Sequence, residues 1–304
     1  MKLSPTKLTG IIGTLICVVL FALNPSWPTP DKLLVFLVFI FMIFGQGLAV
    51  LKKLGPFVAL LLVYESFRGL VPKLNTRVNF MWMPKMDEIL FGTLPTVKLQ
   101  LWLWDGYVKW YDFLFYLAYM LHFILPISLA ILVWKKKTKE YWNVIYSYVI
   151  LTFSGFVTYL LFPAAPPWMA SQQGLIPPIT RISSNVFAAL GIQDFPSLYN
   201  KMSPNPVAAV PSLHSAYATL FSLLIFKMFG KKWGILSLIY PILIYVGTIY
   251  QGEHYAIDAI LGIIYAGFAF IAAPMFVRAS KRAFTKLTKN KTPLLVTEAE
   301  TQEQ

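Results

Sequence analysis

Two histidines are the residues of this sequence whose positions best suit chemistry. His214 lies near the start of an apolar segment, within the Val-Pro-Ser-Leu-His that covers residues 210–214. His254 begins another apolar segment and is followed, four residues later, by Asp258. Side chains four residues apart lie on the same face of a helix, so the Asp258 carboxylate can accept a hydrogen bond from one imidazole nitrogen of His254. The other nitrogen is then left as a nucleophile or a base.

This pair of histidines suits in-line phosphoryl transfer, in which one imidazole attacks phosphorus and the other protonates the leaving oxygen. Ionisable residues within apolar segments are costly and are therefore candidates for function. The third histidine, His122, lies in the middle of an apolar segment, and we expect it to be structural. His214 and His254 can cooperate only if the segments that they begin enter the membrane from the same face.

The composition indicates that membrane helices hold these residues. Of the 304 residues, 57% are hydrophobic and 13% are charged, and the mean hydropathy is +0.63, whereas a soluble domain is about 25% charged. Apolar runs of about 20 residues, long enough to cross a bilayer, recur along the chain. We predict an all-α, polytopic membrane helix bundle of about eight spans with a six-helix catalytic core. The spans are expected near residues 8–23, 33–50, 56–71, 111–134, 141–162, 207–229, 233–250 and 255–277.

Lysines and arginines predict the orientation of these spans. The net charge of +13 comes largely from basic clusters at the ends of apolar runs, which fix topology and meet anionic lipid rather than nucleic acid. With eight spans, the clusters at 52–53, 135–139, 227–232 and 278–291 fall on one side, which the positive-inside rule makes the cytoplasm. We therefore expect a multi-pass protein of the cell membrane, with both termini in the cytoplasm and both histidines at the outer face.

The domain organisation follows from the spans. Residues 1–54 are expected to form an N-terminal anchor of two spans, residues 55–278 the catalytic bundle, and residues 279–304 a cytoplasmic tail that is first basic and then polar. The outer connection near 80–104 mixes aromatic, lysine and aspartate residues, which predicts one or two helices lying in the membrane interface. A further amphipathic piece is expected near 182–190.

Two elements of the sequence resemble one known family. Pro-Ser-Leu-His at 211–214 resembles the Pro-Ser-x-His element of the type 2 phosphatidic acid phosphatase superfamily, and His254 with Asp258 resembles its His-x-x-x-Asp element. The two elements together, in this order and in a matching membrane context, form a specific signal. Similarity to the branch that contains fungal inositol phosphorylceramide synthase is found at Tyr255 and in the segments 64–69, 90–95 and 162–168.

The resemblance implies a role for each of these residues. His254 would be the nucleophile that forms a phosphohistidine, Asp258 would orient it, and His214 would protonate the departing alcohol. The family uses no metal, and we expect none here, nor any other cofactor. Phosphatase members place Ser-Arg shortly before the nucleophilic histidine, where this sequence has Gly247 and Thr248.

The phosphate-gripping Lys-x6-Arg-Pro element of the phosphatase members is also missing from this sequence. Other cations or hydrogen-bond donors must then surround the phosphoryl oxygens. The candidates are Arg68, Lys73, Arg77, Arg181 and Ser212. Arg68 is favoured, because an arginine at the end of a span needs an anionic partner, although a pair with Glu65 is the simpler reading of that charge.

Three functions stay open at this stage. The branch favours a lipid phosphotransferase similar to an inositolphosphotransferase. The alternative is a lipid phosphate phosphatase acting on phosphatidic acid or polyprenyl pyrophosphate, and the second alternative is a non-catalytic transporter or scaffold. The expected partners are a lipid phosphate substrate and membrane lipids, with no nucleic acid, and the sequence does not predict an oligomeric state.

Overall fold

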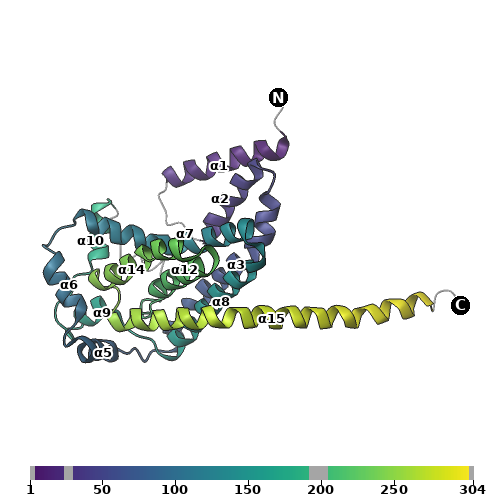
Figure 1. Ribbon diagram of the computed structural model, residues 1–304. Coiled ribbons are helices and arrows are strands. Elements are labelled where there is room, and N and C mark those ends of the chain that lie inside the picture. The colour runs from purple at the N-terminus through teal and green to yellow at the C-terminus, as the bar shows by residue number, and fades with distance from the viewer. Residues whose placement is uncertain (1–3, 24–29, 192–204, 301–304) are drawn as a thin grey trace.

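The computed structural model describes residues 4–23, 30–191 and 205–300, and within them it is built from helices and two isolated β-bridges, with no strand (Figure 1). The longer helices are α1 (Pro5–Leu23), α2 (Pro30–Ile43), α3 (Gly47–Arg68), α7 (Trp110–Lys136), α8 (Tyr141–Leu161), α12 (Leu213–Phe229), α14 (Ile239–Tyr250) and α15 (Ala256–Glu300). The shorter helices are α4 (Val71–Leu74), α5 (Trp82–Phe91), α6 (Pro95–Leu103), η1 (Thr138–Glu140), α9 (Pro167–Gln172), α10 (Ile182–Ala189) and α13 (Lys231–Ser237).

Several of these helices can cross a membrane. Among the described residues, four segments are long and apolar enough for a bilayer, namely Gly47–Leu74, Thr138–Leu161, Lys231–Tyr250 and Ala256–Ala283. Helix α7 would be a fifth span that bends by 52° between His122 and Ile124. The remaining three expected spans fall on the shorter apolar helices α1, α2 and α12. The predicted all-α, polytopic membrane bundle is therefore confirmed, and the chain is an integral membrane protein, although fewer than eight helices reach full spanning length.

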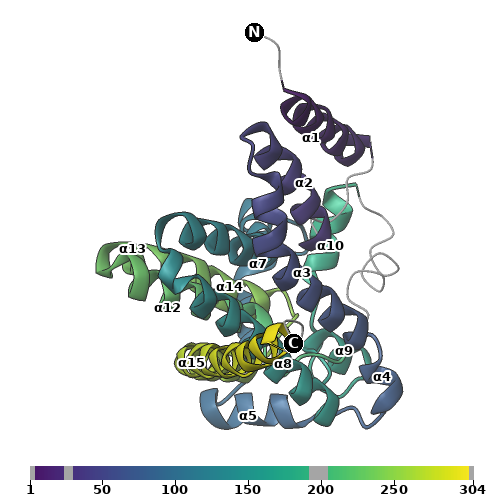
Figure 2. The same cartoon turned by 90° about the vertical axis from the view of Figure 1, so that its right-hand side faces the viewer.

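The main core lies where α3, α7, α8, α12 and α15 meet (Figure 2). Helix α3 contributes a face that includes Leu54 and Phe57, and α8 contributes Tyr148 and Leu151, all of them fully or almost fully buried. Helix α15 contributes small residues, Ala266 and Ala269 among them. In lipid, helix association depends on close van der Waals packing, which small side chains permit.

Two glycines mark close approaches to the start of α12, the helix that carries His214. A Cβ on Gly262 of α15 would lie 2.5 Å from the carbonyl oxygen of Ser212 at the start of α12. A Cβ on Gly155 of α8 would lie 2.9 Å from the Leu213 side chain. The start of α12 thus lies between α8 and α15, and its backbone approaches Gly262 at a distance that leaves no space for a Cβ.

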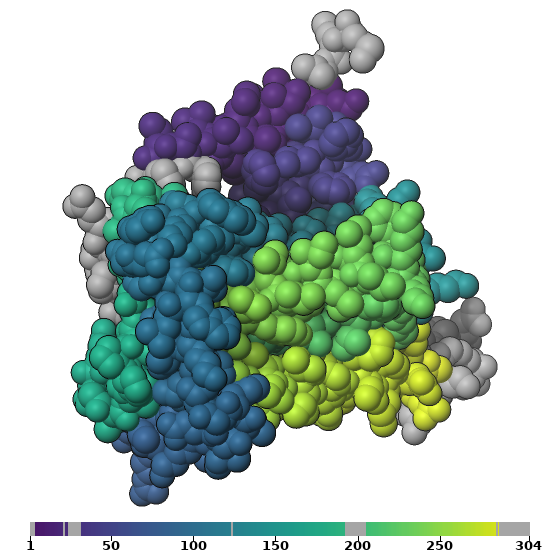
Figure 3. Space-filling view, turned by 60° about the vertical axis from the view of Figure 1, so that its left-hand side comes forward, coloured from purple at the N-terminus to yellow at the C-terminus, as the bar shows by residue number. Residues whose placement is uncertain are grey.

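One end of the bundle carries the short helices α5, α6, α9 and α10 (Figure 1). Figure 3 shows the blue segment that contains α5 and α6 on the face of the molecule, between teal atoms on its left and the green and yellow helices on its right. Large apolar side chains on this segment are exposed, with Ile89 72%, Leu101 78% and Trp102 73% accessible. This pattern agrees with the expected helices near 80–104 and with a location in the membrane interface.

Basic residues gather at the opposite end of the bundle. The Tyr141 hydroxyl donates to the carbonyl oxygen of Lys53 over 2.6 Å, and the Lys135 ammonium contacts the Gln46 side chain. Lys227 lies 3.7 Å from the Glu140 carboxylate. These contacts bring three of the predicted cytoplasmic clusters to one end, which is the arrangement that the positive-inside rule requires.

Helix boundaries differ from the expected ones at three points. Helix α2 ends at Ile43, and α3 begins at Gly47 and continues through the expected domain boundary between residues 54 and 55. The expected span 233–250 is formed by two helices, α13 and α14. Helix α15 begins at Ala256, so His254 precedes the helix instead of lying on it. The expected division into anchor, catalytic bundle and tail stays a prediction.

Candidate active site

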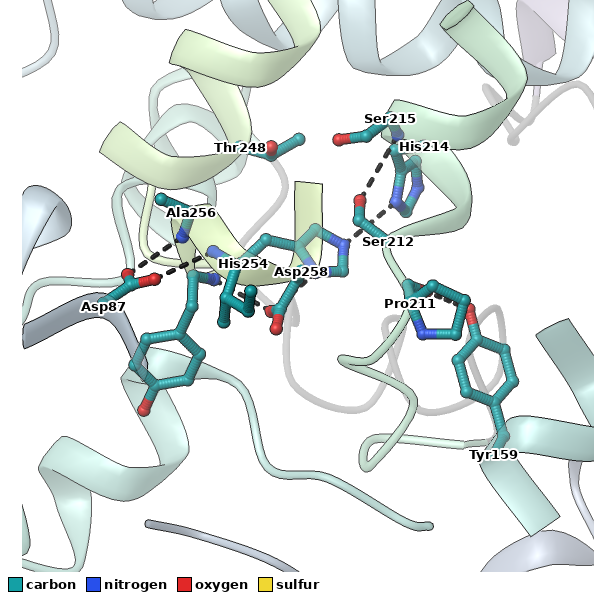
Figure 4. A network of polar contacts seen from close by, with 12 residues as sticks. Asp87, Tyr159, Pro211, Ser212, His214, Ser215, Thr248, His254, Ala256 and Asp258 are labelled. Carbon is teal, nitrogen blue, oxygen red and sulfur yellow. Dashed lines mark hydrogen bonds and ion pairs between the residues drawn. The ribbon is translucent and has the colours of Figure 1, made fainter. Parts of the chain in front are cut away.

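The two histidines of the sequence analysis meet between the starts of α12 and α15. His214 lies in the first turn of α12, and His254 lies two residues before α15. Their Nδ1 and Nε2 atoms, respectively, are 3.3 Å apart, and the rings face each other in Figure 4. Because 40 residues separate them, this contact depends on the packing of α12 against α15. The distance is that of a long hydrogen bond and leaves no space for a phosphorus atom between the two nitrogens.

Asp258 lies behind His254, as the four-residue spacing predicted. Its Oδ2 atom is 3.4 Å from His254 Nδ1 and accepts a hydrogen bond of 2.9 Å from the backbone N–H of Tyr255. The carboxylate is fully buried, and its Oδ1 has no hydrogen-bond partner among the described residues. A carboxylate at Nδ1 holds the proton on that nitrogen and leaves Nε2 unprotonated, so that its lone pair can accept the hydrogen bond from His214.

Asp87 of α5 anchors the start of α15, a role that the sequence analysis missed. Its two carboxylate oxygens accept hydrogen bonds of 2.9 Å and 2.8 Å from the backbone N–H groups of Ala256 and Ile257 (Figure 4). Negative charge at a helix N-terminus is stabilised by these free N–H groups. Burial raises the pKa of Asp87 to about 6, while the two backbone donors lower it. Asp87 therefore holds the turn that carries His254 and Asp258.

The start of α12 is fixed in the same manner by backbone contacts. Ser212 is the N-cap residue, and its Oγ accepts a hydrogen bond of 3.3 Å from the backbone N–H of Ser215. The Ser212 backbone N–H donates to the carbonyl oxygen of Asp258 over 3.0 Å. The Tyr159 hydroxyl donates to the carbonyl oxygen of Pro211 over 2.8 Å. The Pro-Ser-x-His element thus places His214 by capping its helix and tying that helix to α15.

His122 lies beside this pair, and its expected structural role stays a prediction. Its ring centroid is 4.6 Å from that of His214, and the Tyr119 ring stacks on His214 with a centroid distance of 4.1 Å. The bend of α7 beside His122 has a local cause. Pro126 has no N–H to donate to the carbonyl oxygen four residues earlier, which is that of His122.

A cavity of about 130 Å³ opens onto both histidines. Its aromatic lining consists of Tyr64, Tyr116, Tyr119, Tyr159, Phe187 and Tyr217. Its polar lining consists of Glu65, Arg68, His122, Ser183, Asn205, His214, Gln251, Glu253 and His254. The lining residues at 205–209 belong to a loop that is tied to Ala164. Ala209 N donates to the Ala164 carbonyl oxygen over 3.2 Å, and Ala164 N donates to the Val207 carbonyl oxygen over 2.8 Å.

The predicted phosphate-binding residues lie at different distances from this cavity. Arg68 lines it, and its guanidinium is 3.2 Å from the Glu65 carboxylate. Lys73 and Arg77 are exposed and are not among the lining residues. Ser212 is fully buried and serves as the cap of α12. A phosphate-binding role stays a prediction for each of them.

Arg181 stands behind the cavity wall as part of a buried ion pair. Its Nε and a terminal nitrogen donate to the Glu253 carboxylate over 2.9 Å and 3.3 Å. The Ser183 hydroxyl also donates to this carboxylate, and the Arg181 guanidinium lies 4.2 Å from the centre of the Trp168 ring. Glu253 directly precedes His254, so the pair fixes the loop on the side that α15 does not hold. Nothing in the sequence near Glu253 signals a partner 72 residues away.

Metal ligands do not cluster in this region. Among the described residues, no group of three or more histidine, cysteine, aspartate and glutamate side chains could hold an ion. The expectation that the protein works without a metal stays a prediction.

Comparison with known proteins agrees with the resemblance seen in the sequence. The family model of the PAP2 superfamily matches residues 90–272, a range that contains both histidine elements. Phosphoinositol dihydroceramide synthase of Bacteroides thetaiotaomicron is 36% identical over 141 residues, which are 43% of this chain and 45% of that protein. No solved structure matches the chain. Because the family model covers more than half of the sequence, the chain belongs to the PAP2 superfamily.

Proposed function

We propose that the protein is a membrane-embedded lipid phosphotransferase that works through a phosphohistidine on His254. The observation that carries the proposal is the convergence of His214 and His254 on one cavity, with Asp258 behind the second ring. The name of the Bacteroides relative supports a headgroup transfer, in which a phosphoinositol group is a candidate for the moving group.

In the first step, the Nε2 lone pair of His254 attacks the phosphorus of the donor lipid, and the bond from phosphorus to the oxygen of the lipid alcohol breaks. His214 donates its proton to that oxygen, and the neutral alcohol leaves. Asp258 accepts the hydrogen bond from Nδ1 of His254 and stabilises the positive charge that develops on this ring.

In the second step, the hydroxyl group of an acceptor attacks the phosphorus of the phosphohistidine. His214, which is now neutral, takes the proton of that hydroxyl, and the phosphorus–nitrogen bond breaks to return His254 to its starting state. Water in place of the acceptor hydroxyl would make the protein a phosphatase. The two activities therefore share every step except the choice of the second nucleophile.

The hydrogen bond between His214 and His254 must open before phosphorus can approach. The nitrogens are 3.3 Å apart, whereas a phosphoryl group between them needs about 3 Å on each side. The stacked Tyr119 and the neighbouring His122 border the ring that has to move. Arg68 is our candidate for the cation that meets the phosphate, since it lines the cavity and its present partner Glu65 is a carboxylate that an anionic substrate can replace.

We further propose that the end with the short helices faces outward and that the basic end faces the cytoplasm. The contacts of Lys53, Lys135 and Lys227 at one end support this orientation, and the exposed apolar side chains of α5 and α6 suit the interface at the other end. Both termini of a chain with eight spans would then be cytoplasmic.

The test is lipid turnover by purified protein in nanodiscs. Wild type is incubated with phosphatidylinositol plus a ceramide or diacylglycerol acceptor, or with phosphatidic acid alone, and products are quantified by mass spectrometry. His254→Ala should abolish product, and a donor labelled in its phosphate should leave label on wild type that brief acid treatment removes. Normal turnover by a folded His254→Ala protein would refute the mechanism. Release of free phosphate instead of transfer would identify the phosphatase.

A further inference from the structure

The cavity has few groups that can donate hydrogen bonds to a phosphoryl group. Charge spreads over the non-bridging oxygens of a phosphoryl group during transfer, and catalysis depends on positioned cations and donors around them. Arg68 is paired with Glu65, and Arg181 is paired with Glu253 behind the wall. The Gln251 amide in the lining already donates to the carbonyl oxygen of Asp112 over 3.2 Å.

Asn205 differs from these three side chains. Its side chain lines the cavity together with both histidines, and the residue is only 2% exposed. Its Oδ1 accepts a hydrogen bond of 3.2 Å from the backbone N–H of Val207. That bond fixes the orientation of the amide, because only the oxygen can accept from an N–H group. The Nδ2 atom then points away from the turn, and it has no hydrogen-bond partner among the described residues.

The turn that carries Asn205 is itself held in place. The carbonyl oxygen of Val207 accepts from Ala164 N over 2.8 Å, and Ala209 N donates to the carbonyl oxygen of Ala164 over 3.2 Å. The same stretch of chain leads directly to Ser212, which caps the helix of His214. Asn205 is therefore fixed in relation to the histidine pair by backbone hydrogen bonds.

An unpaired amide N–H in a buried site costs about 1–3 kcal/mol. Such a cost is expected where the donor is satisfied by a ligand. The neighbouring histidines indicate an acceptor that carries oxygen and negative charge, which a phosphoryl group provides.

We propose that Asn205 donates a hydrogen bond from Nδ2 to a non-bridging oxygen of the phosphoryl group as it moves to and from His254. This inference rests on the proposed function and adds to it a donor that takes up part of the role of the missing Lys-x6-Arg-Pro element. The hydrogen bond strengthens as charge builds on the oxygen, so it acts mainly on kcat and less on KM.

Two substitutions separate this role from a purely structural one. Asn205→Asp keeps the acceptor for the Val207 N–H but loses the donor, and Asn205→Ala loses both. We expect Asn205→Asp to fold with a melting temperature in nanodiscs close to that of wild type. Asn205→Ala should fold with a lower melting temperature, because the Val207 N–H loses its acceptor. Both variants should lose about 10²-fold or more in kcat. Wild-type turnover by Asn205→Asp together with damage by Asn205→Ala would mean that the residue only supports the turn, and would overturn the proposal.

Orthovanadate gives a second readout that needs no knowledge of the lipid, because it imitates the five-coordinate phosphorus of the transition state. Its affinity, measured by the shift in melting temperature, should fall about 10²-fold in Asn205→Asp. Equal vanadate affinity in wild type and Asn205→Asp would overturn the proposal. The turnover of His254→Ala distinguishes failure of the proposed function from failure of the Asn205 proposal. If His254→Ala is active, the proposed function fails. If His254→Ala is inactive while Asn205→Asp has wild-type turnover, only the role of Asn205 fails.

Discussion

Substitution of Gly262 by alanine should separate the two histidine-bearing helices and cost both stability and activity. The added Cβ would lie 2.5 Å from the carbonyl oxygen of Ser212, 3.1 Å from Ser215 Cβ and 3.2 Å from Ala216 N. The first distance falls short of ordinary van der Waals contact by about 0.9 Å. Two of the three neighbours are backbone atoms, so no side-chain rotation relieves the clash.

The helices must therefore move, and the shift begins two residues before His214. Overpacking of this kind costs about 1–3 kcal/mol of stability. A misplacement of about 1 Å between reacting groups can lower a rate about 10²-fold. We expect Gly262→Ala to show a lower melting temperature and a kcat reduced by about one to two orders of magnitude, measured by lipid turnover in nanodiscs.

Gly267→Ala is the matched control, because it makes the same change on the same helix. A Cβ on Gly267 meets no atom within 4 Å. Alanine is favoured over glycine in a helix by up to about 1 kcal/mol, so this variant should be as stable as wild type or more so and fully active. If Gly262→Ala matched Gly267→Ala in both measurements, the close approach of α12 and α15 would not control the site.

Three further predictions concern carboxylates around the site. Asp258→Asn should lower kcat by up to about 10⁴-fold, because an amide does not hold the proton on Nδ1 of His254. Glu140→Gln at the basic end of the bundle is the control. Equal turnover in the two variants would contradict the role of Asp258. Glu253→Gln removes the charged partner of Arg181, whose side chain is 13% exposed. The variant should be less stable by about 3 kcal/mol, which a lower melting temperature would show. An unchanged melting temperature would show that the ion pair contributes nothing. The pKa of the Asp87 carboxyl is raised on folding from 3.8 to about 6, so the folded protein binds this proton more tightly than the unfolded chain does. As the pH rises from about 4 to about 6, wild type should therefore lose stability relative to Asp87→Asn, and above pH 6 the stability difference should stay constant. A difference in melting temperature that is the same at every pH would refute this.

Local spacing and hydropathy were enough to predict the class of fold and the meeting of the two histidines. That these histidines are the reacting pair stays a prediction. The contact between His254 and Asp258 was predicted from helix geometry, and it is present even though His254 precedes α15. That His214 and His254 lie at the same end of the bundle followed from counting apolar spans. Both inferences use short-range regularities, namely the repeat of a helix and the length of a membrane span.

The supporting residues could not be predicted in this way. Asp87 contacts a helix start 169 and 170 residues further along the chain, and Arg181 meets a carboxylate 72 residues away. His122 lies beside His214 on α7, which bends next to it, and Asn205 lines the cavity from a turn held by Ala164. Amino-acid sequence determined which groups could react and on which spans they lie. Only the packing of distant segments decided which other side chains surround them, because such contacts depend on the positions of whole helices and leave no periodic signal near either partner.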